Sequence, residues 1–447
     1  MIQLYKVKTA MTGNIAKIIL IFLIGYNLYT YQIDSVLIPY FDEQGYISAG
    51  LRLIEHTINE NWSHPPLGKI LIGLSTHHIG NYPLGWRLPS ILSGSIILVA
   101  MYFMSKIFFK DRFSPIYSLV LTLINPLLFI NSRIATLDAA MTAAIIIGLL
   151  MFSNYWLRNR SYKWLLLSYM SFGISASIKW FGFVPLILCT IILLTCSYKV
   201  RSKSLLYSTV LSFFIAMLFY IVAITSYIGM KHPIYAIPLS TSRPIVGSYL
   251  VKYSIHKLIS LHVNMLTAQM SFKNIDSPIT SNWHEWPIKL GVTWVLYPYN
   301  KLIGSRQVTK GVGIIPNPFL VLMGLMSVIL CAYIWIKSKS KEAALLSAFY
   351  FGFLLSWAII PRKTQYYYYY LPSSVILGLS VVYVFEFLRI KHLYRSTVIL
   401  ISVIFFIYSH PLMTNHELNE AEFRDRMRYL SKLNIIEAIY LETLQQR

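Results

Sequence analysis

Two adjacent carboxylates stand out in a chain that contains few acids. Asp42 and Glu43 are neighbours, and the 447 residues include only 17 Asp and Glu in total. A carboxylate in such a setting could accept a proton from a hydroxyl nucleophile or hold a divalent cation. The pair alone does not decide between these uses and a structural one, because acids at a helix start also stabilise the helix N-terminus.

A run of hydroxyl-bearing side chains follows a basic residue far along the chain. Arg362 precedes five consecutive tyrosines, Tyr366 to Tyr370. The planar guanidinium offers a fork of donors that matches phosphate, and the hydroxyls of Tyr368 and Tyr370 could bind phosphate or sugar beside it. An aromatic belt at a membrane surface would need fewer tyrosines than this.

Two further segments contain unusual polar and aromatic residues. The letters HPPLGK run from His64 to Lys69, where the two prolines force an extended turn and Gly68 permits a close approach before a new helix. Such a turn could fix the acids in place. Trp283 and Trp286 lie close together in a polar segment, and they suit a membrane interface as well as a binding site.

The composition places these residues in a membrane protein. Charged residues make up 13% of the chain, hydrophobic residues 56%, and 39 Lys and Arg give a net charge of +22. A soluble chain has about a quarter charged residues, so a soluble enzyme is excluded. The cations are scattered between apolar runs, whereas a nucleic-acid binder gathers them on one face. The three cysteines all lie in apolar runs, which argues against a disulfide framework or a thiolate metal site.

Hydropathy predicts an all-α polytopic fold with about eleven membrane-spanning helices. The predicted spans are 14–33, 89–109, 113–131, 137–157, 163–178, 180–197, 205–228, 314–336, 343–361, 367–388 and 395–411. The domain prediction is therefore a membrane catalytic domain over 1–411, with two long loops at 34–88 and 229–313, followed by a polar tail over 412–447.

The positions of the cations predict the orientation of the spans. Small groups of Lys and Arg precede the first span and recur after each even-numbered one, which places the N-terminus in the cytoplasm and the two loops and the tail outside. Four cations depart from this rule and lie at outer ends, namely Arg133, Lys179, Arg362 and Lys363. Charge at membrane depth often marks function, although snorkelling, or a pair between Arg133 and Asp138, would also explain single cases.

These motifs together resemble the protein O-mannosyltransferase family, the dolichyl-phosphate-mannose protein mannosyltransferases of the GT-C class. The matching pieces are Phe41-Asp42-Glu43, the HPPLGK turn, Ser132-Arg133 with Leu137-Asp138, Lys179-Trp180 with Gly182, Trp283 with Trp286-Pro287, and Arg362 with Tyr368 and Tyr370-Leu371-Pro372. The HPPLGK turn is the most specific of them. The eleven-span layout also agrees with the family.

The resemblance implies an inverting transfer of mannose from a polyprenyl phosphate to Ser or Thr hydroxyls of proteins on the external face. Asp42 would act as general base, and Glu43 would position the acceptor or the sugar. The donor phosphate would be held by Arg133 and Arg362, with Lys179, Tyr368 and Tyr370 beside them. His64, Trp283 and Trp286 would support the loops or line the acceptor groove.

The sequence also departs from the family. Tyr369 stands where members commonly have a histidine, which puts the role of that histidine in doubt here. The loop 229–313 has no room for the β-trefoil domain of eukaryotic members, which favours a prokaryotic plasma membrane over the endoplasmic reticulum. The tail over 412–447 carries no family motif.

Two alternative functions remain open from the sequence. A related enzyme could transfer the sugar to a lipid or cell-envelope glycan, as aminoarabinose transferases do. A transporter of a lipid-linked sugar fits less well, because transporters carry their charges near the membrane midplane and show internal repeats. The resemblance points to metal-independent transfer, so no cofactor is predicted, although Asp42 and Glu43 could bind a divalent cation. The predicted partners are the polyprenyl-phosphate sugar, a protein or peptide acceptor and the bilayer, with a dimer possible and no nucleic acid.

Overall fold

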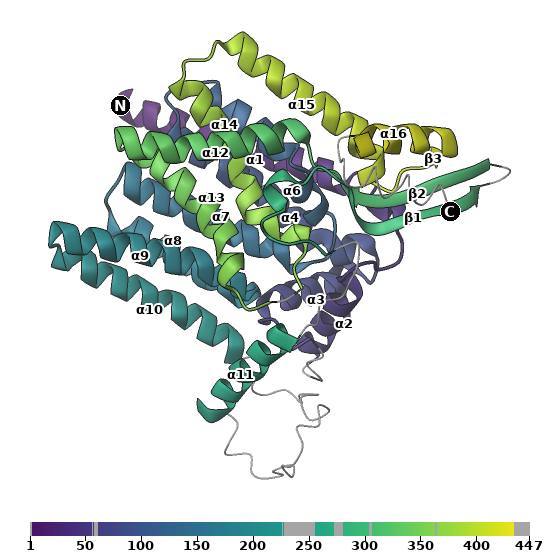
Figure 1. The fold of residues 1–447 in the computed structure, drawn as a ribbon. Coiled ribbons are helices and arrows are strands. Elements are labelled where there is room, and N and C mark those ends of the chain that lie inside the picture. Colours follow the sequence, from purple (N-terminus) through teal and green to yellow (C-terminus); the bar gives the residue numbers. More distant parts are fainter. Residues whose placement is uncertain are drawn as a thin grey trace.

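Helices make up most of the chain in the computed structural model (Figure 1). The structure describes residues 2–55, 57, 61–225, 227, 255–271, 280–303, 306–362 and 364–432. The long helices are α1 (Ile2–Thr30), α4 (Pro83–Phe108), α7 (Leu137–Leu157), α8 (Tyr162–Ile178), α9 (Phe183–Val200), α10 (Lys203–Thr225), α12 (Pro318–Ser338), α13 (Lys341–Ile359), α14 (Leu371–Phe387) and α15 (His392–Met413).

Nine helical segments in this described part are long and apolar enough to cross a membrane. They coincide with nine of the eleven predicted spans. The other two predicted spans are also helical but shorter: α8 has 17 residues, and 113–131 is divided into α5 (Ser114–Leu123) and α6 (Pro126–Asn131). The prediction of a polytopic helical membrane protein is confirmed, whereas the exact count of eleven is not.

Capping residues explain where two of the predicted spans differ from the helices. Asn125 accepts hydrogen bonds from the amides of Leu127 and Leu128, and Pro126 starts α6, so the apolar run breaks there. Asn317 caps α12 in the same way, with Pro318 at the first helical position. The helix therefore begins at Pro318, whereas hydropathy alone placed its start at 314.

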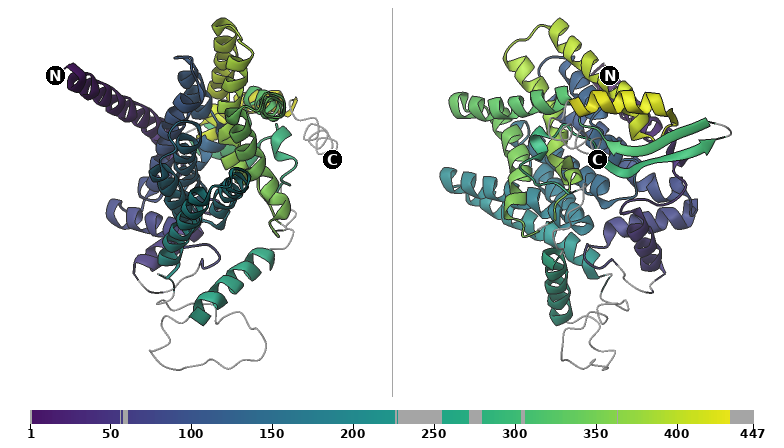
Figure 2. Two further views of the ribbon diagram at one scale, coloured as in Figure 1. Left: turned by 90° about the vertical axis from the view of Figure 1, so that its left-hand side faces the viewer. Right: turned by 45° about the vertical axis from the view of Figure 1, so that its right-hand side comes forward.

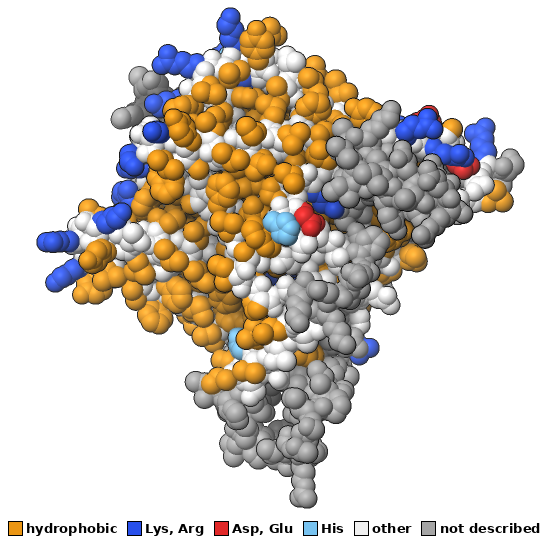
Figure 3. Space-filling view, viewed as in Figure 1, with side chains coloured by type: hydrophobic (Ala, Val, Ile, Leu, Met, Phe, Trp, Pro, Cys, Tyr) orange, Lys and Arg blue, Asp and Glu red, His pale blue; other side chains and the backbone are white. Residues whose placement is uncertain are grey.

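The core of the bundle is formed by helices that are covered on all sides. In the most apolar stretch of Tyr367–Phe387, which contains α14, 89% of the residues are buried, whereas only 17% are buried in that of Asn14–Ser35, which contains the end of α1. Helix α7 packs on α4 and α8, and α14 packs on α12, α13 and α5. Figure 2 shows α1 projecting from the body of the bundle. Apolar side chains cover most of the face in Figure 3, as expected for a surface that contacts lipid.

Short elements gather at one end of the bundle, which we call the loop end. The predicted loop 34–88 contains η1 (Ile33–Ser35), α2 (Glu43–Ile54) and α3 (Leu67–Ile79). Helix α11 (Ile255–Ser271) and the 3-10 turns η2 (Trp180–Gly182), η5 (Trp286–Ile288) and η6 (Tyr367–Tyr370) complete this end. Of the predicted loop 229–313, residues 229–254, 272–279 and 304–305 lie outside the described residues.

A small antiparallel sheet, which the sequence analysis did not predict, projects beside the loop end. Strands β1 (Thr293–Ile303) and β2 (Arg306–Ile314) form a hairpin, and β3 (Leu418–Asn419) pairs with β2 (Figure 1). Helix α16 (Glu420–Lys432) packs on β2 and β3. The first part of the predicted tail 412–447 is therefore ordered on the sheet, and residues 433–447 lie outside the described part.

The opposite end of the bundle, which we call the basic end, carries small groups of cations at the ends of the long helices. Lys106, Arg158, Lys199 and Lys337 lie at the ends of α4, α7, α9 and α12. Figure 3 shows Lys and Arg side chains along one edge of the apolar face. This separation of charge from apolar surface agrees with an integral multi-pass membrane protein.

Candidate active site

Asp42 lies at the loop end, where the chain enters α2. The residue is exposed, and its Oδ2 accepts a hydrogen bond of 3.1 Å from the hydroxyl of Tyr368. Protein atoms still surround the carboxylate on many sides, and this burial raises the pKa of Asp42, against the opposing effects of Lys179, the Tyr368 hydrogen bond and Arg362. A carboxylate that is accessible and more basic than usual is suited to accept a proton.

Glu43 occupies a different environment from its neighbour. Its side chain is fully buried and forms a bidentate pair with Arg87, at 2.7 Å and 2.9 Å. The same carboxylate accepts hydrogen bonds from the amides of Ala135 and Tyr40. These contacts occupy both carboxylate oxygens of Glu43. Glu43 therefore fixes the start of α2 and does not face the space beside Asp42.

Lys179 forms a buried ion pair close to Asp42. It lies between α8 and η2, and its Nζ is 2.8 Å and 3.0 Å from the two carboxylate oxygens of Asp138. The Nζ also lies 4.4 Å from the ring centroid of Tyr369. Burial lowers the pKa of Lys179, and Asp138 opposes that shift. Asp138 therefore pairs with Lys179 and not with Arg133, the partner that the sequence spacing suggested.

Arg362 is held above the tyrosine run by a residue from α11. Its Nη1 donates a hydrogen bond of 2.6 Å to Oε1 of Gln269, and its Nε donates to the carbonyl of Thr364. The guanidinium lies 5.2 Å from the ring centroid of Tyr369. Gln269 also donates to the carbonyl of Ser63, beside the HPPLGK turn. Lys363, the neighbouring cation, lies outside the described residues.

Arg133 is not part of this group of side chains. Its guanidinium donates hydrogen bonds to the carbonyls of Tyr29 at 2.8 Å and of Leu28 and Gln32 at 3.4 Å. These carbonyls lie at and just after the C-terminal end of α1, where a cation is favourable. The predicted phosphate contact of Arg133 stays a prediction that these bonds do not support.

The tyrosine run divides between the site and the core. Tyr368 reaches Asp42 and packs edge-on against Phe41. Tyr370 instead bonds the hydroxyl of Tyr350 at 2.7 Å inside the bundle. Tyr369, which replaces the common histidine, stacks on Trp357 with ring centroids 4.6 Å apart. Of the two predicted phosphate-binding tyrosines, only Tyr368 faces the site.

The HPPLGK turn is held from within by its own lysine. Lys69 is fully buried, and its Nζ donates to the carbonyls of Asn61 and His64. The hydroxyl of Tyr227 donates to the same His64 carbonyl at 2.8 Å. The imidazole of His64 lies near the ring of Tyr46, and burial together with nearby cations lowers its pKa well below the usual value. His64 therefore enters the site region as a neutral side chain.

The two predicted tryptophans lie behind the tyrosine run. Trp286 is fully buried, donates from its indole nitrogen to Oγ of Ser281, and packs against Trp357. Trp283 is partly exposed, and its amide donates to Oε1 of Gln365. Trp286 thus supports the loop, whereas Trp283 remains accessible at its surface.

Three residues that the sequence analysis did not assign to the site position it. Arg87 neutralises Glu43, Gln269 holds Arg362, and Asp138 pairs with Lys179. A cation at the start of an apolar span, as at Arg87, is a usable signal in the sequence. Gln269 lies on an amphipathic helix whose sequence gives no such signal. In the described residues, no three His, Cys, Asp or Glu side chains gather closely enough to hold a metal ion.

Comparison with known proteins gives a family match over part of the chain and a shared fold over most of it. Residues 63–224 match the family model described as dolichyl-phosphate-mannose-protein mannosyltransferase. No curated protein matches the sequence of the chain. The matched segment 63–224 contains the HPPLGK turn, Arg133 and Lys179.

Three solved structures share the fold over most of the chain. The S. cerevisiae protein O-mannosyltransferase Pmt1-Pmt2 complex bound to the sugar donor matches with a TM-score of 0.69 and 11% identity, covering 93% of this chain and 92% of that one. ArnT from Cupriavidus metallidurans bound to undecaprenyl phosphate matches with a TM-score of 0.54 and 13% identity, covering 88% and 64%. The Archaeoglobus fulgidus oligosaccharyltransferase matches with a TM-score of 0.55 and 12% identity, covering 90% and 53%.

These comparisons confirm the resemblance found in the sequence. The family model accounts for the segment that carries the most specific motif, and the fold agreement extends over nearly the whole chain. The chain therefore has the fold shared by these membrane glycosyltransferases, and its residues 63–224 are similar to the dolichyl-phosphate-mannose-protein mannosyltransferase family.

Proposed function

We propose that this glycosyltransferase moves mannose from a polyprenyl phosphate to Ser or Thr hydroxyls of proteins at the external membrane face. The observation that supports this most directly is the position of Asp42. It is an accessible carboxylate with a raised pKa, next to Tyr368 and within the electrostatic influence of Lys179 and Arg362. A lipid-linked donor is favoured because the matched yeast complex is bound to the sugar donor and the matched ArnT to undecaprenyl phosphate.

The reaction can be written as a single displacement. The acceptor oxygen attacks C1 of the sugar, while a carboxylate oxygen of Asp42 takes the hydroxyl proton. The bond from C1 to the phosphate oxygen breaks, and its electron pair leaves with the polyprenyl phosphate. Glu43 and Asp138 are both held in ion pairs, so neither is free to form a covalent sugar intermediate. One displacement with one base inverts the configuration at C1.

Cations and hydroxyls at the loop end suit the leaving phosphate. Arg362 is half-buried and already oriented by Gln269, and a guanidinium can donate to two phosphate oxygens. Lys179 adds positive charge from below the tyrosine rings. Fixed charge aimed at the leaving group is often the largest contribution to catalysis. We do not assign the phosphate to Arg133, because its donors already serve three carbonyls.

The test is transfer of labelled mannose from polyprenyl-phosphate mannose to a Ser/Thr-rich peptide by the purified protein. The wild type should label the peptide, and Asp42→Asn should reduce the rate by about 10²–10⁴-fold, the usual contribution of a positioned base. Gln44→Asn, an exposed position two residues away, serves as the matched control and should keep the activity. Normal peptide labelling by Asp42→Asn would disprove the assignment of the base.

A second candidate function changes only the acceptor. The shared fold with ArnT favours considering a lipid or cell-envelope glycan as the acceptor. The same reaction mixture, supplemented with extracted membrane lipids and separated into lipid and peptide fractions, distinguishes the two. Label that enters only the lipid fraction would move this candidate to first place.

Metal independence and assembly are the remaining parts of the proposal. The cations at the site supply the charge that a divalent ion would otherwise provide, so we expect transfer to continue in the presence of a chelator. Loss of transfer in the chelator, restored by added Mg²⁺ or Mn²⁺, would contradict this. A dimer is compatible with the proposal, and light scattering of the purified protein would determine it.

A further inference from the structure

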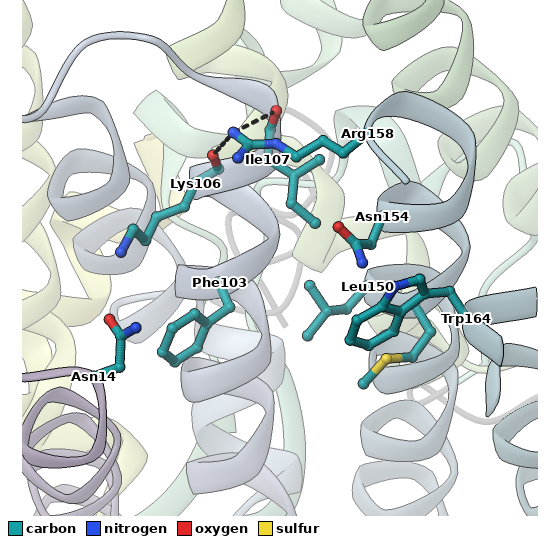
Figure 4. Close-up of a pocket in the computed structure, with 9 residues that line it drawn as sticks. Asn14, Phe103, Lys106, Ile107, Leu150, Asn154, Arg158 and Trp164 are labelled. Carbon is teal, nitrogen blue, oxygen red and sulfur yellow. Dashed lines mark hydrogen bonds between the residues drawn. The ribbon is translucent and has the colours of Figure 1, made fainter. Parts of the chain in front are cut away.

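A cavity opens at the basic end of the bundle, far from Asp42. It has a volume of about 390 Å³ and lies between α4 and α7, with α1 and the start of α8 at its sides (Figure 4). Helix α7 has 21 residues and runs from Asp138 at the loop end to this cavity, a rise of about 30 Å. The cavity is therefore separate from the proposed transfer site.

Two cations, Lys106 and Arg158, line this cavity and have no carboxylate partner among the residues that the structure describes. Nη2 of Arg158 donates to the backbone carbonyls of Lys106 and Ile107, which holds the guanidinium across the end of α4 (Figure 4). Lys17 and Arg158 both repel the charge of Lys106. Among the described residues, neither Lys106 nor Arg158 forms an ion pair. A bound anion would relieve this repulsion.

Uncharged polar groups face the same space. The side-chain amides of Asn14 and Asn154 line the cavity (Figure 4) and make no hydrogen bond within the described part of the chain. The remaining wall is apolar and includes Phe103, Leu150 and the indole of Trp164. The cavity thus has cations at its opening, amides beside them and an apolar wall. This order matches the charged phosphate, the polar linker and the acyl chain of a phospholipid.

We propose that this cavity binds a phospholipid with an anionic headgroup. The phosphate lies between Lys106 and Arg158, whose cationic donors match its oxygens. Asn154 takes the polar groups next to the phosphate, and the start of an acyl chain lies along Phe103 and Leu150. A soluble anion would use the cations and leave the apolar wall uncovered, so the lipid accounts for more of the lining.

Competition between two lipids tests the proposal on the full-length protein. Detergent-purified, delipidated protein is mixed with equal amounts of phosphatidylglycerol and phosphatidylcholine, and the retained lipid is measured by native mass spectrometry. The wild type should retain phosphatidylglycerol in about tenfold or greater excess, because each nearby cation favours an anionic lipid. Lys106→Gln/Arg158→Gln should lose that excess.

A charge-matched control separates the cavity from general attraction to a basic surface. Lys110→Gln/Lys163→Gln removes the same charge from exposed positions near this end that do not line the cavity, and it should keep the excess. Equal loss in both double variants would overturn the proposal. Asn154→Leu leaves the charges intact and should weaken retention, and size-exclusion chromatography shows whether each variant is folded.

Fluorescence quenching locates the lipid. Brominated phosphatidylglycerol should quench the wild type more than brominated phosphatidylcholine, and Trp164→Phe should remove most of the difference because Trp164 lines the cavity. Displacement of phosphatidylglycerol by inorganic phosphate alone would identify a simple anion site and overturn the lipid assignment. A difference in quenching that survives in Trp164→Phe would place the lipid elsewhere and also overturn it.

Discussion

Asp42 and Glu43 are adjacent in the chain and yet have opposite surroundings. Glu43 is enclosed and neutralised by Arg87, whereas Asp42 is exposed and has only a single hydroxyl as its hydrogen-bond partner among the described residues. The buried carboxylate of Glu43 therefore helps to position Asp42. Because Glu43 fixes the first residue of α2, the carboxylate of Asp42 is presented at a defined place beside Tyr368.

The raised pKa of Asp42 predicts how activity and stability depend on pH. Protonated Asp42 cannot act as a base, so the acid limb of the pH–rate profile should lie above the ordinary aspartate pKa of about 3.9. A carboxyl whose pKa is raised by folding costs stability once it ionises, as the pH rises from the unfolded to the folded pKa. Asp42→Asn removes that cost.

Thermal unfolding of the wild type and of Asp42→Asn across a range of pH checks the predicted effect on stability. Asp42→Asn should unfold at a higher temperature than the wild type near pH 8, and the difference should shrink as the pH falls toward 4. A variant that is inactive and also less stable at every pH would show that the carboxylate is structural.

The buried pair of Glu43 and Arg87 predicts a large loss of stability when one partner is removed. Glu43→Gln leaves the guanidinium buried without its counter-charge, which costs about 3–5 kcal/mol. The same substitution at Glu420, which forms an exposed pair with Arg424, should cost only about 0–1 kcal/mol. Unfolding midpoints of the two variants give the comparison. Similar midpoints would contradict the anchoring role of Glu43.

The sequence was sufficient to find the acid pair but not to divide the roles within it. That division depends on Arg87, which lies 44 residues from Glu43. The alternative of a pair between Arg133 and Asp138 fails for a similar reason. Spacing along the chain suggested Arg133 for Asp138, but α8 returns Lys179 to the start of α7, 41 residues later. Partners brought together by long connections cannot be read from local spacing.

At the scale of elements, the crossing of α2 and α3 sets the depth of the site. The two helices touch through backbone at Gly50 and Gly73. A Cβ on Gly50 would lie 2.5 Å from the carbonyl oxygen of Lys69 and 2.7 Å from the amide of Gly73. Since α2 starts at Glu43 and α3 begins at Leu67 within the HPPLGK turn, this contact joins the proposed base to the turn.

An alanine at this crossing should therefore impair transfer without touching any reacting group. Gly73→Ala forces the helices apart, which costs about 1–3 kcal/mol, and a displacement of about 1 Å at Asp42 would reduce the rate by about 10²-fold. Gly45→Ala is the control, because its Cβ would meet only Asn61 Nδ2 at 3.7 Å. Peptide labelling by the folded variants checks this. Unchanged activity in Gly73→Ala would show that the crossing does not govern the site.

Hydropathy predicted the long helices well and the elements between them poorly. Apolar runs specify spans because the membrane requires them. The hairpin of β1 and β2 falls in a mixed segment of aromatic and polar residues, which contains no apolar run long enough to indicate a span. Its β-branched and aromatic residues favour a strand. The hairpin is further stabilised by α16, which packs on β2, and by β3, which pairs with β2.

At the scale of the whole molecule, the segregation of charge predicts a fixed orientation. Small groups of Lys and Arg lie at the basic end, and Asp42 lies at the loop end, so the positive-inside rule predicts that Asp42 faces the outside. Single cysteines at Gln44 and Lys110, both exposed positions, report the two sides.

Labelling with a membrane-impermeant maleimide reads out this orientation in sealed right-side-out vesicles. Gln44→Cys should react in intact vesicles, whereas Lys110→Cys should react only after permeabilisation. The background protein carries Cys196→Ser, because the other two native cysteines are buried. The reverse pattern would place the transfer site in the cytoplasm and exclude an external acceptor.

The segment after the last membrane helix closes back onto the start of the first loop. Oγ of Ser35 donates to the carbonyl of Thr414 at 2.9 Å, and Nδ2 of Asn415 donates to the carbonyl of Ser35 at 2.8 Å. Translation of the chain adds Thr414 and Asn415 only 379 and 380 residues after Ser35. The loop that contains Asp42 is thus synthesised long before the residues that bond its start, so a chain translated only as far as α15 still lacks these two hydrogen bonds.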